Sequence, residues 1–216
     1  MAKISASLLA ADFSNMGQDI LRAQSAGVDA LHFDMMDGHY VPNIALSPQH
    51  LTALRKYSNL PFHLHLELCN PDYVLDHFLQ LDADVIFVQW DTLVDPIKTF
   101  TRIRSRGAKV GLSYNPGDDF IAGRSYIQYL DYFLILSVLP GFGGQSMKSG
   151  TPERILSAKK LIQTEKTNVQ LMVDGGVNLD NALSLIQAGI DWLIIGNDLF
   201  KQQNMDGYIQ KIKSLK

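Results

Sequence analysis

The stretches 29-DALHFD-34 and 61-PFHLHLE-67 decide the fold, because each is a short, largely apolar run that ends in polar residues. Runs of this kind predict buried strands of a parallel sheet, and longer segments with helical periodicity separate them along the chain. The eight expected strands are Ile4–Leu9, Asp29–Asp34, Pro61–Glu67, Val85–Trp90, Lys109–Ser113, Tyr132–Ser137, Val169–Asp174 and Trp192–Gly196. The expected helices are Asn15–Ala26, Ser47–Tyr57, Pro71–Leu81, Pro96–Arg106, Pro152–Thr164 and Leu179–Ala188.

This alternation predicts an α/β protein whose strands close into a single (β/α)8 barrel, the TIM-barrel architecture. We expect residues 1–216 to form one domain, because no linker or low-complexity tract interrupts the pattern. The segment after Asn115 is short and polar, so its helix is the weakest of the set. An open, doubly wound sheet with fewer strands is the structural alternative.

The composition excludes several classes of protein. A hydrophobic share of 46% is enough for a sizeable core, yet no apolar run reaches the roughly 20 residues that a membrane span needs. A net charge of −3 without a basic run argues against a nucleic-acid partner. The N-terminus lacks signal-peptide features, and Cys69 is the only cysteine. We therefore expect a soluble, cytoplasmic protein that acts on a small molecule.

Polar side chains gather at the carboxyl ends of three expected strands, where barrel enzymes carry their chemistry. His32 and Asp34 share one face of their strand because side chains alternate, and His65 and Asp174 end two other strands. A lone histidine there is more often a hydrogen-bond donor at the barrel mouth, but four such residues favour a metal site. We predict that all four bind one divalent ion, with zinc, iron, manganese and cobalt all acceptable. His63, one layer deeper, is interpreted as a hydrogen-bonded core residue.

Two aspartates beside one metal suit proton transfer at a carbon next to a carbonyl group. Asp34 and Asp174 would serve opposite faces of the substrate, one as a charged base and the other as a protonated acid. Inversion at carbon needs both groups, since a single base returns the proton to the face that it left. We therefore predict that the environments of these two carboxyls hold their pKa values apart.

Glycine-rich segments follow three consecutive strands. They are PGFGGQ at residues 140–145, Gly175-Gly176 and Gly196-Asn197. A single glycine pair is more often a tight turn, but three clusters at adjacent strand ends predict backbone N–H groups arranged around a phosphate. The first cluster is also long enough to act as a lid that excludes water from the substrate.

Several motifs together resemble a known family. They are SLLAADF at residues 7–13, HFDMMDGHYVPN at 32–43, His65-Leu66, Asn115-Pro116, PGFGGQ at 140–145 and VDGG at 173–176. With them the chain resembles the ribulose-phosphate 3-epimerase family over nearly its whole length. The resemblance implies a barrel of the ribulose-phosphate-binding type and an isomerase of the pentose phosphate pathway. It also implies conversion of D-ribulose 5-phosphate to D-xylulose 5-phosphate through an enediolate, and an oligomer of identical chains.

The resemblance also implies roles for individual residues. Asp34 and Asp174 would be acid and base as well as metal ligands, together with the ligands His32 and His65. The substrate-binding residues that it implies are Ser7, Met36, Gly141, Gly143, Gly144, Gly175, Gly176, Gly196 and Asn197.

Several departures from the family pattern surround this site. Glu67 and Leu136 each stand where the family usually has methionine, and Gln89-Trp90-Asp91 replaces H-x-E. Asp198 follows Gly196-Asn197, and its charge would repel a phosphate unless its side chain points away. These departures keep another ketose phosphate, such as D-allulose 6-phosphate, open as the substrate.

Two further alternatives differ in class. A barrel that decarboxylates a keto-acid phosphate commonly has a lysine after a strand-end aspartate, and no lysine follows Asp34. A non-catalytic barrel that only senses a sugar phosphate would have no need to keep the whole set of predicted ligands and carboxyls. Stoichiometric metal binding separates an epimerase from a metal-free sensor.

Overall fold

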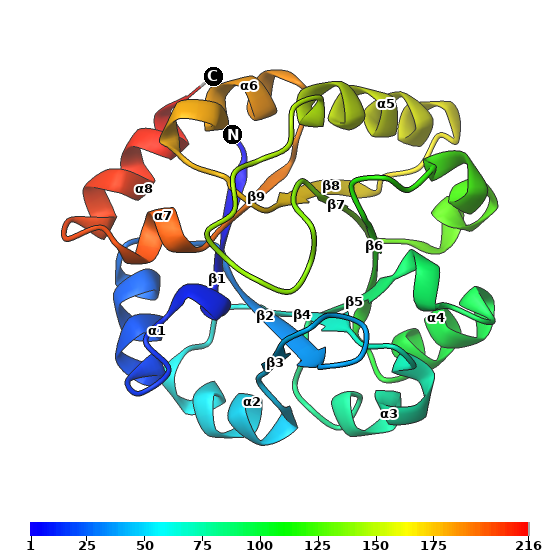
Figure 1. The fold of residues 1–216 in the computed structure, drawn as a ribbon, viewed down its shortest axis with the longest axis horizontal. Coiled ribbons are helices and arrows are strands. Elements are labelled where there is room, and N and C mark those ends of the chain that lie inside the picture. Colours follow the sequence, from blue (N-terminus) through cyan, green and yellow to red (C-terminus); the bar gives the residue numbers. More distant parts are fainter. Residues whose placement is uncertain (216) are drawn as a thin grey trace.

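Eight parallel strands close into a barrel in the computed structural model, which describes residues 1–215. A ring of helices surrounds the barrel (Figure 1). The barrel strands are β1 (Lys3–Ser7), β2 (Ala30–Asp37), β4 (Phe62–Glu67), β5 (Val85–Gln89), β6 (Lys109–Tyr114), β7 (Tyr132–Leu136), β8 (Gln170–Asp174) and β9 (Trp192–Ile195). Each predicted strand is therefore present, with its ends shifted by a few residues.

The barrel closes where β1 pairs in parallel with both β2 and β9. Ser7 stands opposite His32 across the first of these pairings, and Lys3 stands opposite Trp192 across the second. A doubly wound sheet would leave two open edges, so this closure excludes the open-sheet alternative. The TIM-barrel prediction is confirmed.

Strand β2 is longer than predicted, and the chain turns back after it to form a short neighbouring strand. It continues to Asp37, and the two-residue strand β3 (Ile44–Ala45) pairs with it in antiparallel fashion. Gly38 has a φ of 73° and donates its N–H to the Asn43 carbonyl at 3.0 Å, which closes the turn between the strands. The expected end at Asp34 was wrong because Met35 and Met36 are also buried and extend the apolar run.

The helices begin at residues that suit a first turn, because Pro71 and Pro96 open two of them and Asn70 and Asp95 accept backbone N–H groups there. The helices are α1 (Met16–Ser25), α2 (Pro48–Leu54), α3 (Pro71–Phe78), α4 (Pro96–Ser105), α5 (Thr151–Thr164), α6 (Leu179–Gln187), α7 (Asn197–Phe200) and α8 (Met205–Ser214). Helices α7 and α8 lie outside the segments for which the sequence predicts a helix. Within residues 1–215, no helix has the length and apolar character of a membrane span.

The weak segment after Asn115 forms a 3-10 helix, Phe120–Tyr129, instead of an α-helix. It packs on β6, where the Tyr114 ring stacks on Phe133 at 4.6 Å between ring centroids. Gly123 leaves room for the Tyr114 hydroxyl, because a Cβ at that position would lie 2.0 Å from it.

The barrel interior is filled by side chains below the polar strand ends. Its apolar cluster consists of Ala30, Val85, Phe87, Tyr132, Leu134, Leu136, Met172, Trp192 and Ile194. A separate and larger cluster fills the space between the strands and the surrounding helices. The polar strand ends at the carboxyl end of the barrel are therefore where a site is expected.

One glycine lets the interior layer pack. A Cβ added at Gly111 would lie 2.1 Å from the Phe87 ring, whereas a Cβ at Gly117 would meet nothing within 4 Å. We predict that Gly111→Ala lowers the free energy of unfolding by about 1–3 kcal/mol through overpacking. Urea unfolding measures the change, with Gly117→Ala as the matched control and Phe87→Leu added to Gly111→Ala as the rescue. Equal effects of the two single substitutions would contradict this account.

Candidate active site

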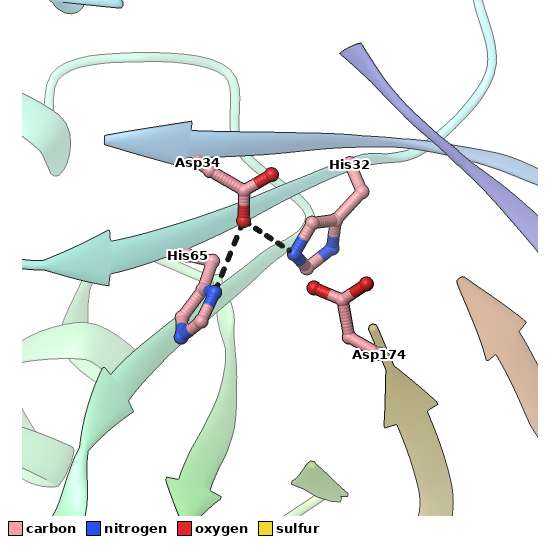
Figure 2. Close-up of side chains that lie close together, drawn as sticks. All are labelled: His32, Asp34, His65 and Asp174. Atoms are coloured by element: carbon pink, nitrogen blue, oxygen red, sulfur yellow. Dashed lines mark hydrogen bonds and ion pairs between the residues drawn. The ribbon is translucent and has the colours of Figure 1, made fainter. Parts of the chain in front are cut away.

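The four predicted metal ligands meet at the carboxyl end of the barrel. His32 and Asp34 come from β2, His65 comes from β4 and Asp174 ends β8 (Figure 2). Asp34 stands opposite His65 in the parallel pairing of β2 with β4, so the register of these strands brings the two side chains together. One donor atom from each of the four residues lies within 4.8 Å of the others, and three of the residues are buried.

Asp34 lies at the centre of this group. Its Oδ1 lies 3.1 Å from His65 Nδ1 and 3.2 Å from His32 Nε2, and its Oδ2 accepts a hydrogen bond from the Ser7 hydroxyl at 3.0 Å. The contact with His32 lacks hydrogen-bond geometry, and both nitrogens of that fully buried ring have no hydrogen-bond partner. Because a buried polar atom without a partner is costly, the His32 ring is the feature of this cluster that best fits a bound ligand.

The two carboxyls of the cluster have opposite pKa shifts. Burial raises the pKa of Asp34, but the contacts with His32 and His65 outweigh it and hold that pKa well below its ordinary value. Burial, together with the negative charge of Asp34, raises the pKa of Asp174 to about 6. Near neutral pH the site therefore separates a firmly ionised carboxylate from one that takes up a proton readily.

A third carboxyl, Glu67, points into the same region from the end of β4. It is buried, one of its oxygens has no hydrogen-bond partner, and the other lies 3.5 Å from His65 Nδ1. Burial raises the pKa of Glu67 well above its ordinary value, and the charges of Asp34 and Asp174 raise it further. The sequence shows the glutamate, but only the fold shows that it faces two aspartates.

All the predicted substrate-binding residues line one cavity of about 460 Å³ above this cluster. They are Ser7, Met36, Gly141, Gly143, Gly144, Gly175, Gly176, Gly196 and Asn197. Asp34, Glu67 and Asp174 form its floor, whereas His32 and His65 lie buried beneath. The segment between β7 and α5 runs across the barrel opening in yellow-green (Figure 1) and supplies much of the lining.

The glycine-rich segments lie next to one another in this cavity. A Cβ at Gly143 would lie 2.7 Å from Asn197 Oδ1, so the segment after β7 touches the start of α7. The Asn43 amide donates to the Gly141 carbonyl at 2.7 Å and ties the same segment to the turn after β2. Side chains as well as backbone therefore hold the predicted lid over the cavity.

The charge of Asp198 is paired, although the residue lines the same cavity as the glycine segments. Its carboxylate accepts the Tyr208 hydroxyl at 2.6 Å and pairs with Lys201, one turn further along the chain. Burial raises the pKa of Asp198, but the bonds from Lys201 and Tyr208 outweigh it and lower the pKa overall. The expected repulsion is thus balanced by a cation. Sequence analysis missed Lys201 as a cavity residue, although its spacing of four residues from Asn197 predicts one helical face.

His63 and Gln89 are both buried near the cluster. His63 is buried among the rings of Phe87, Tyr132 and Trp192, and its Nδ1 has no hydrogen-bond partner. The interpretation of His63 as a hydrogen-bonded core residue is therefore wrong at that atom, because aromatic neighbours replace polar ones. Gln89, one of the departures from the family pattern, is fully buried, with its amide nitrogen 3.1 Å from His65 Nε2.

Fold and site together define an α/β barrel protein with a histidine and aspartate cluster at the active end of the barrel. The model of the ribulose-phosphate 3 epimerase family matches residues 3–200. Relatives named ribulose-phosphate 3-epimerase include one from Buchnera aphidicola, 36% identical over 96% of this chain and 91% of its own length, and one from Escherichia coli K12, 34% identical over 98% and 94%. The chain belongs to the ribulose-phosphate 3-epimerase family.

Similar solved structures agree on the fold. A mutant tryptophan synthase α-subunit from Pyrococcus furiosus has a TM-score of 0.72 at 13% identity, covering 99% of this chain and 97% of that one. Orotidine 5'-phosphate decarboxylase from Pyrococcus horikoshii has a TM-score of 0.69 at 12% identity, covering 97% and 96%. At such identities these similarities concern the barrel alone.

The raised pKa of Asp174 predicts a pH-dependent effect on stability. An acid whose pKa is higher in the folded state than its ordinary 3.8 destabilises the fold as pH rises through the interval from about 4 to about 6. Metal-free Asp174→Asn is therefore expected to exceed the parent protein in unfolding free energy by on the order of 2 kcal/mol at pH 7 and by little at pH 4. Urea unfolding of chelator-treated proteins across pH 4–8 measures this; a pH-independent difference argues against it.

The buried Glu67 carboxyl predicts a second effect on stability. Methionine has a similar volume and removes both the oxygen without a partner and the repulsion by Asp34 and Asp174. We expect metal-free Glu67→Met to raise the free energy of unfolding at pH 7 by roughly 1–3 kcal/mol. The matched control is Leu136→Met, an apolar exchange in the same cavity that should change stability by less than about 1.5 kcal/mol. A destabilised Glu67→Met protein would show that the carboxyl contributes to the fold.

Proposed function

We propose that this protein catalyses the 3-epimerisation of D-ribulose 5-phosphate to D-xylulose 5-phosphate, with Asp34 and Asp174 as the acid and base. The observation that carries the proposal is the separation of their pKa values in one buried cluster. Family membership supplies the reaction class, and the cluster supplies the groups that the reaction requires. The protein is accordingly an isomerase that acts on a carbohydrate.

The two aspartates divide the work of inversion. The carboxyl that is ionised removes the proton at carbon 3, and the carboxyl that holds a proton returns one to the opposite face. Asp34 and Asp174 come from β2 and β8, which lie on opposite sides of β1 and β9 in the barrel, so a substrate in the cavity can lie between them. For the reverse reaction the roles exchange, because each carboxyl ends the cycle in the state in which the other began.

The residues present fit a divalent metal ion. Asp34 Oδ1 lies 3.1–3.2 Å from one nitrogen of each histidine, close to the ~3.4 Å expected between neighbouring ligands with bonds of ~2.1 Å. The largest separation, 4.8 Å, exceeds the span of two such bonds by only ~0.6 Å, so a small shift of one side chain would complete the site. When bound, the ion would supply positive charge that stabilises the negative charge developing on the substrate oxygens. The mixed donor set suits zinc, iron, manganese or cobalt.

The rest of the cavity suits the phosphate end of the substrate. Five residues bring their backbone to this part of the cavity, and four of them are glycines, which have no side chain to cover it. They are Gly143, Gly144, Gly176, Gly196 and Asn197. Backbone N–H groups bind a phosphate without the desolvation of a buried lysine. The segment containing Gly141 closes over the substrate and limits the access of water to the reacting carbons. Ser7 and Met36 complete the wall near the metal ligands.

Glu67 is the cavity residue that bears on the choice of sugar. It adds a polar, hydrogen-bonding group to a wall where the family resemblance implies a methionine. We therefore pair D-ribulose 5-phosphate with D-allulose 6-phosphate in the same assay. The cytoplasmic location and the association of identical chains stay predictions.

Solvent exchange tests the reaction and its acid and base. Metal-loaded protein in heavy water should incorporate deuterium at carbon 3 of D-ribulose 5-phosphate and form D-xylulose 5-phosphate. Asp34→Asn and Asp174→Asn should each lower kcat for epimerisation by about 10²–10⁴-fold, because each removes one proton-transfer group. NMR of the sugar phosphates follows both exchange and inversion.

The controls separate chemistry from binding. Asp91→Asn changes a rim carboxylate that bonds Tyr40 and Asn115 outside the cavity, and it should retain most of the activity. Deuterium incorporation into D-allulose 6-phosphate but not into D-ribulose 5-phosphate would make the longer sugar phosphate the substrate. Absence of exchange with either sugar, in protein shown to hold metal, would overturn the proposal.

A further inference from the structure

Gln89 is a fully buried residue at the end of β5, and its amide contacts a predicted metal ligand. Its amide nitrogen lies 3.1 Å from His65 Nε2, on the side of the imidazole that faces away from the cluster. The other ring nitrogen, Nδ1, lies 3.1 Å from Asp34 Oδ1 (Figure 2). Both nitrogens of the His65 ring are therefore in polar contact, one with a carboxylate and the other with an amide.

The donor and the acceptor in each of these two contacts follow from where the His65 ring carries its proton. A carboxylate only accepts hydrogen bonds, so His65 Nδ1 must carry the ring proton and donate it to Asp34. The opposite nitrogen of a neutral imidazole is then an acceptor, which matches the Gln89 amide N–H that points at it. In the metal-free protein, Asp34 and Gln89 together hold His65 as the tautomer protonated on Nδ1.

This tautomer is the wrong one for a metal ligand. Nδ1 is the ring nitrogen that faces Asp34, so it is the atom of His65 available to a metal in the cluster. A nitrogen that binds a metal carries no proton, and the ring proton must then lie on Nε2. That N–H is buried and requires an acceptor. The amide nitrogen that now faces it cannot accept a hydrogen bond.

The acceptor is present on the same side chain. Gln89 Oε1 is buried and has no hydrogen-bond partner. Rotation of the terminal amide by 180° exchanges Oε1 for the nitrogen, and this torsion has only a broad, roughly two-fold preference. Ser113 stands opposite Gln89 in the pairing of β5 with β6, and its buried hydroxyl also lacks a partner. The Ser113 hydroxyl and Gln89 Oε1 are not hydrogen-bonded to each other in the present orientation, but a hydroxyl can accept from an amide N–H, so Ser113 is a candidate acceptor for the Gln89 nitrogen after the rotation.

We propose that Gln89 is a positioning residue for the metal site, whose amide donates to His65 in the metal-free protein and turns to accept from His65 when metal binds. The inference rests on the metal site of the proposed function. The pairing of β5 with β6 holds the Gln89 main chain in place during this exchange, and the Gln89 carbonyl also accepts the Thr92 hydroxyl at 3.0 Å. Orienting partners of this kind typically contribute 10–100-fold to metal affinity.

Zinc binding in three variants tests the acceptor. The dissociation constant for Zn²⁺ is measured by competition with a chromophoric chelator. Gln89→Leu offers no acceptor and should bind zinc about 10–100-fold more weakly than the parent protein. Gln89→Glu keeps an acceptor oxygen in the same place and should restore affinity to within about threefold of the parent or better. Thr92→Val removes only the contact with the Gln89 carbonyl and should leave the affinity unchanged.

Nitrogen-15 NMR of the histidine rings in the parent protein reads the tautomer directly and does not depend on any variant folding. Metal-free His65 should carry its proton on Nδ1, and zinc-loaded His65 should carry it on Nε2. An unchanged tautomer in zinc-loaded protein, or equal zinc affinities of Gln89→Leu and the parent, would overturn the role of Gln89. Failure of the parent protein to bind zinc, manganese, cobalt or iron would instead overturn the metal site itself.

Discussion

The contact of Asp34 with two imidazoles is the interaction on which the rest of the active end depends. A buried carboxylate is stable only when cations or hydrogen-bond donors surround it, and here His65 and Ser7 are hydrogen-bonded to Asp34 while the His32 ring lies 3.2 Å from it. These partners reach Asp34 because β2 pairs with β1 on one side and with β4 on the other. The same strand register therefore closes the barrel and brings the polar groups of the site together.

The active end is built at some cost to stability. His32, Glu67, Gln89 and Ser113 all hold a buried polar atom without a partner, whereas the interior below them is a layer of aromatic and aliphatic side chains. Burying such atoms is unfavourable, so a sequence selected for stability alone would continue the apolar layer upward. These four side chains gather around one cluster and one cavity, as expected of a site whose ligand completes the bonding, although His63 in the layer below also holds a buried nitrogen without a partner.

Sequence reasoning located the barrel strands and the four clustered side chains, because apolar runs with polar ends are a local signal. It did not locate β3, since a two-residue strand depends on the turn closed by Gly38 and Asn43 and has no periodicity of its own. The partners of Asp198 and the burial of Gln89 depend on contacts between elements. Such contacts depend on where the helices lie and on how the barrel closes, so local patterns in the sequence do not predict them.

The bond from the Asn43 amide to the Gly141 carbonyl joins two segments nearly a hundred residues apart in the chain. The acceptor is a main-chain atom, so its identity does not depend on which side chain occupies that position. A substitution elsewhere in the segment that covers the cavity can therefore leave its attachment to the turn after β2 intact. This attachment needs one side chain only, that of Asn43, which lies outside the cavity lining.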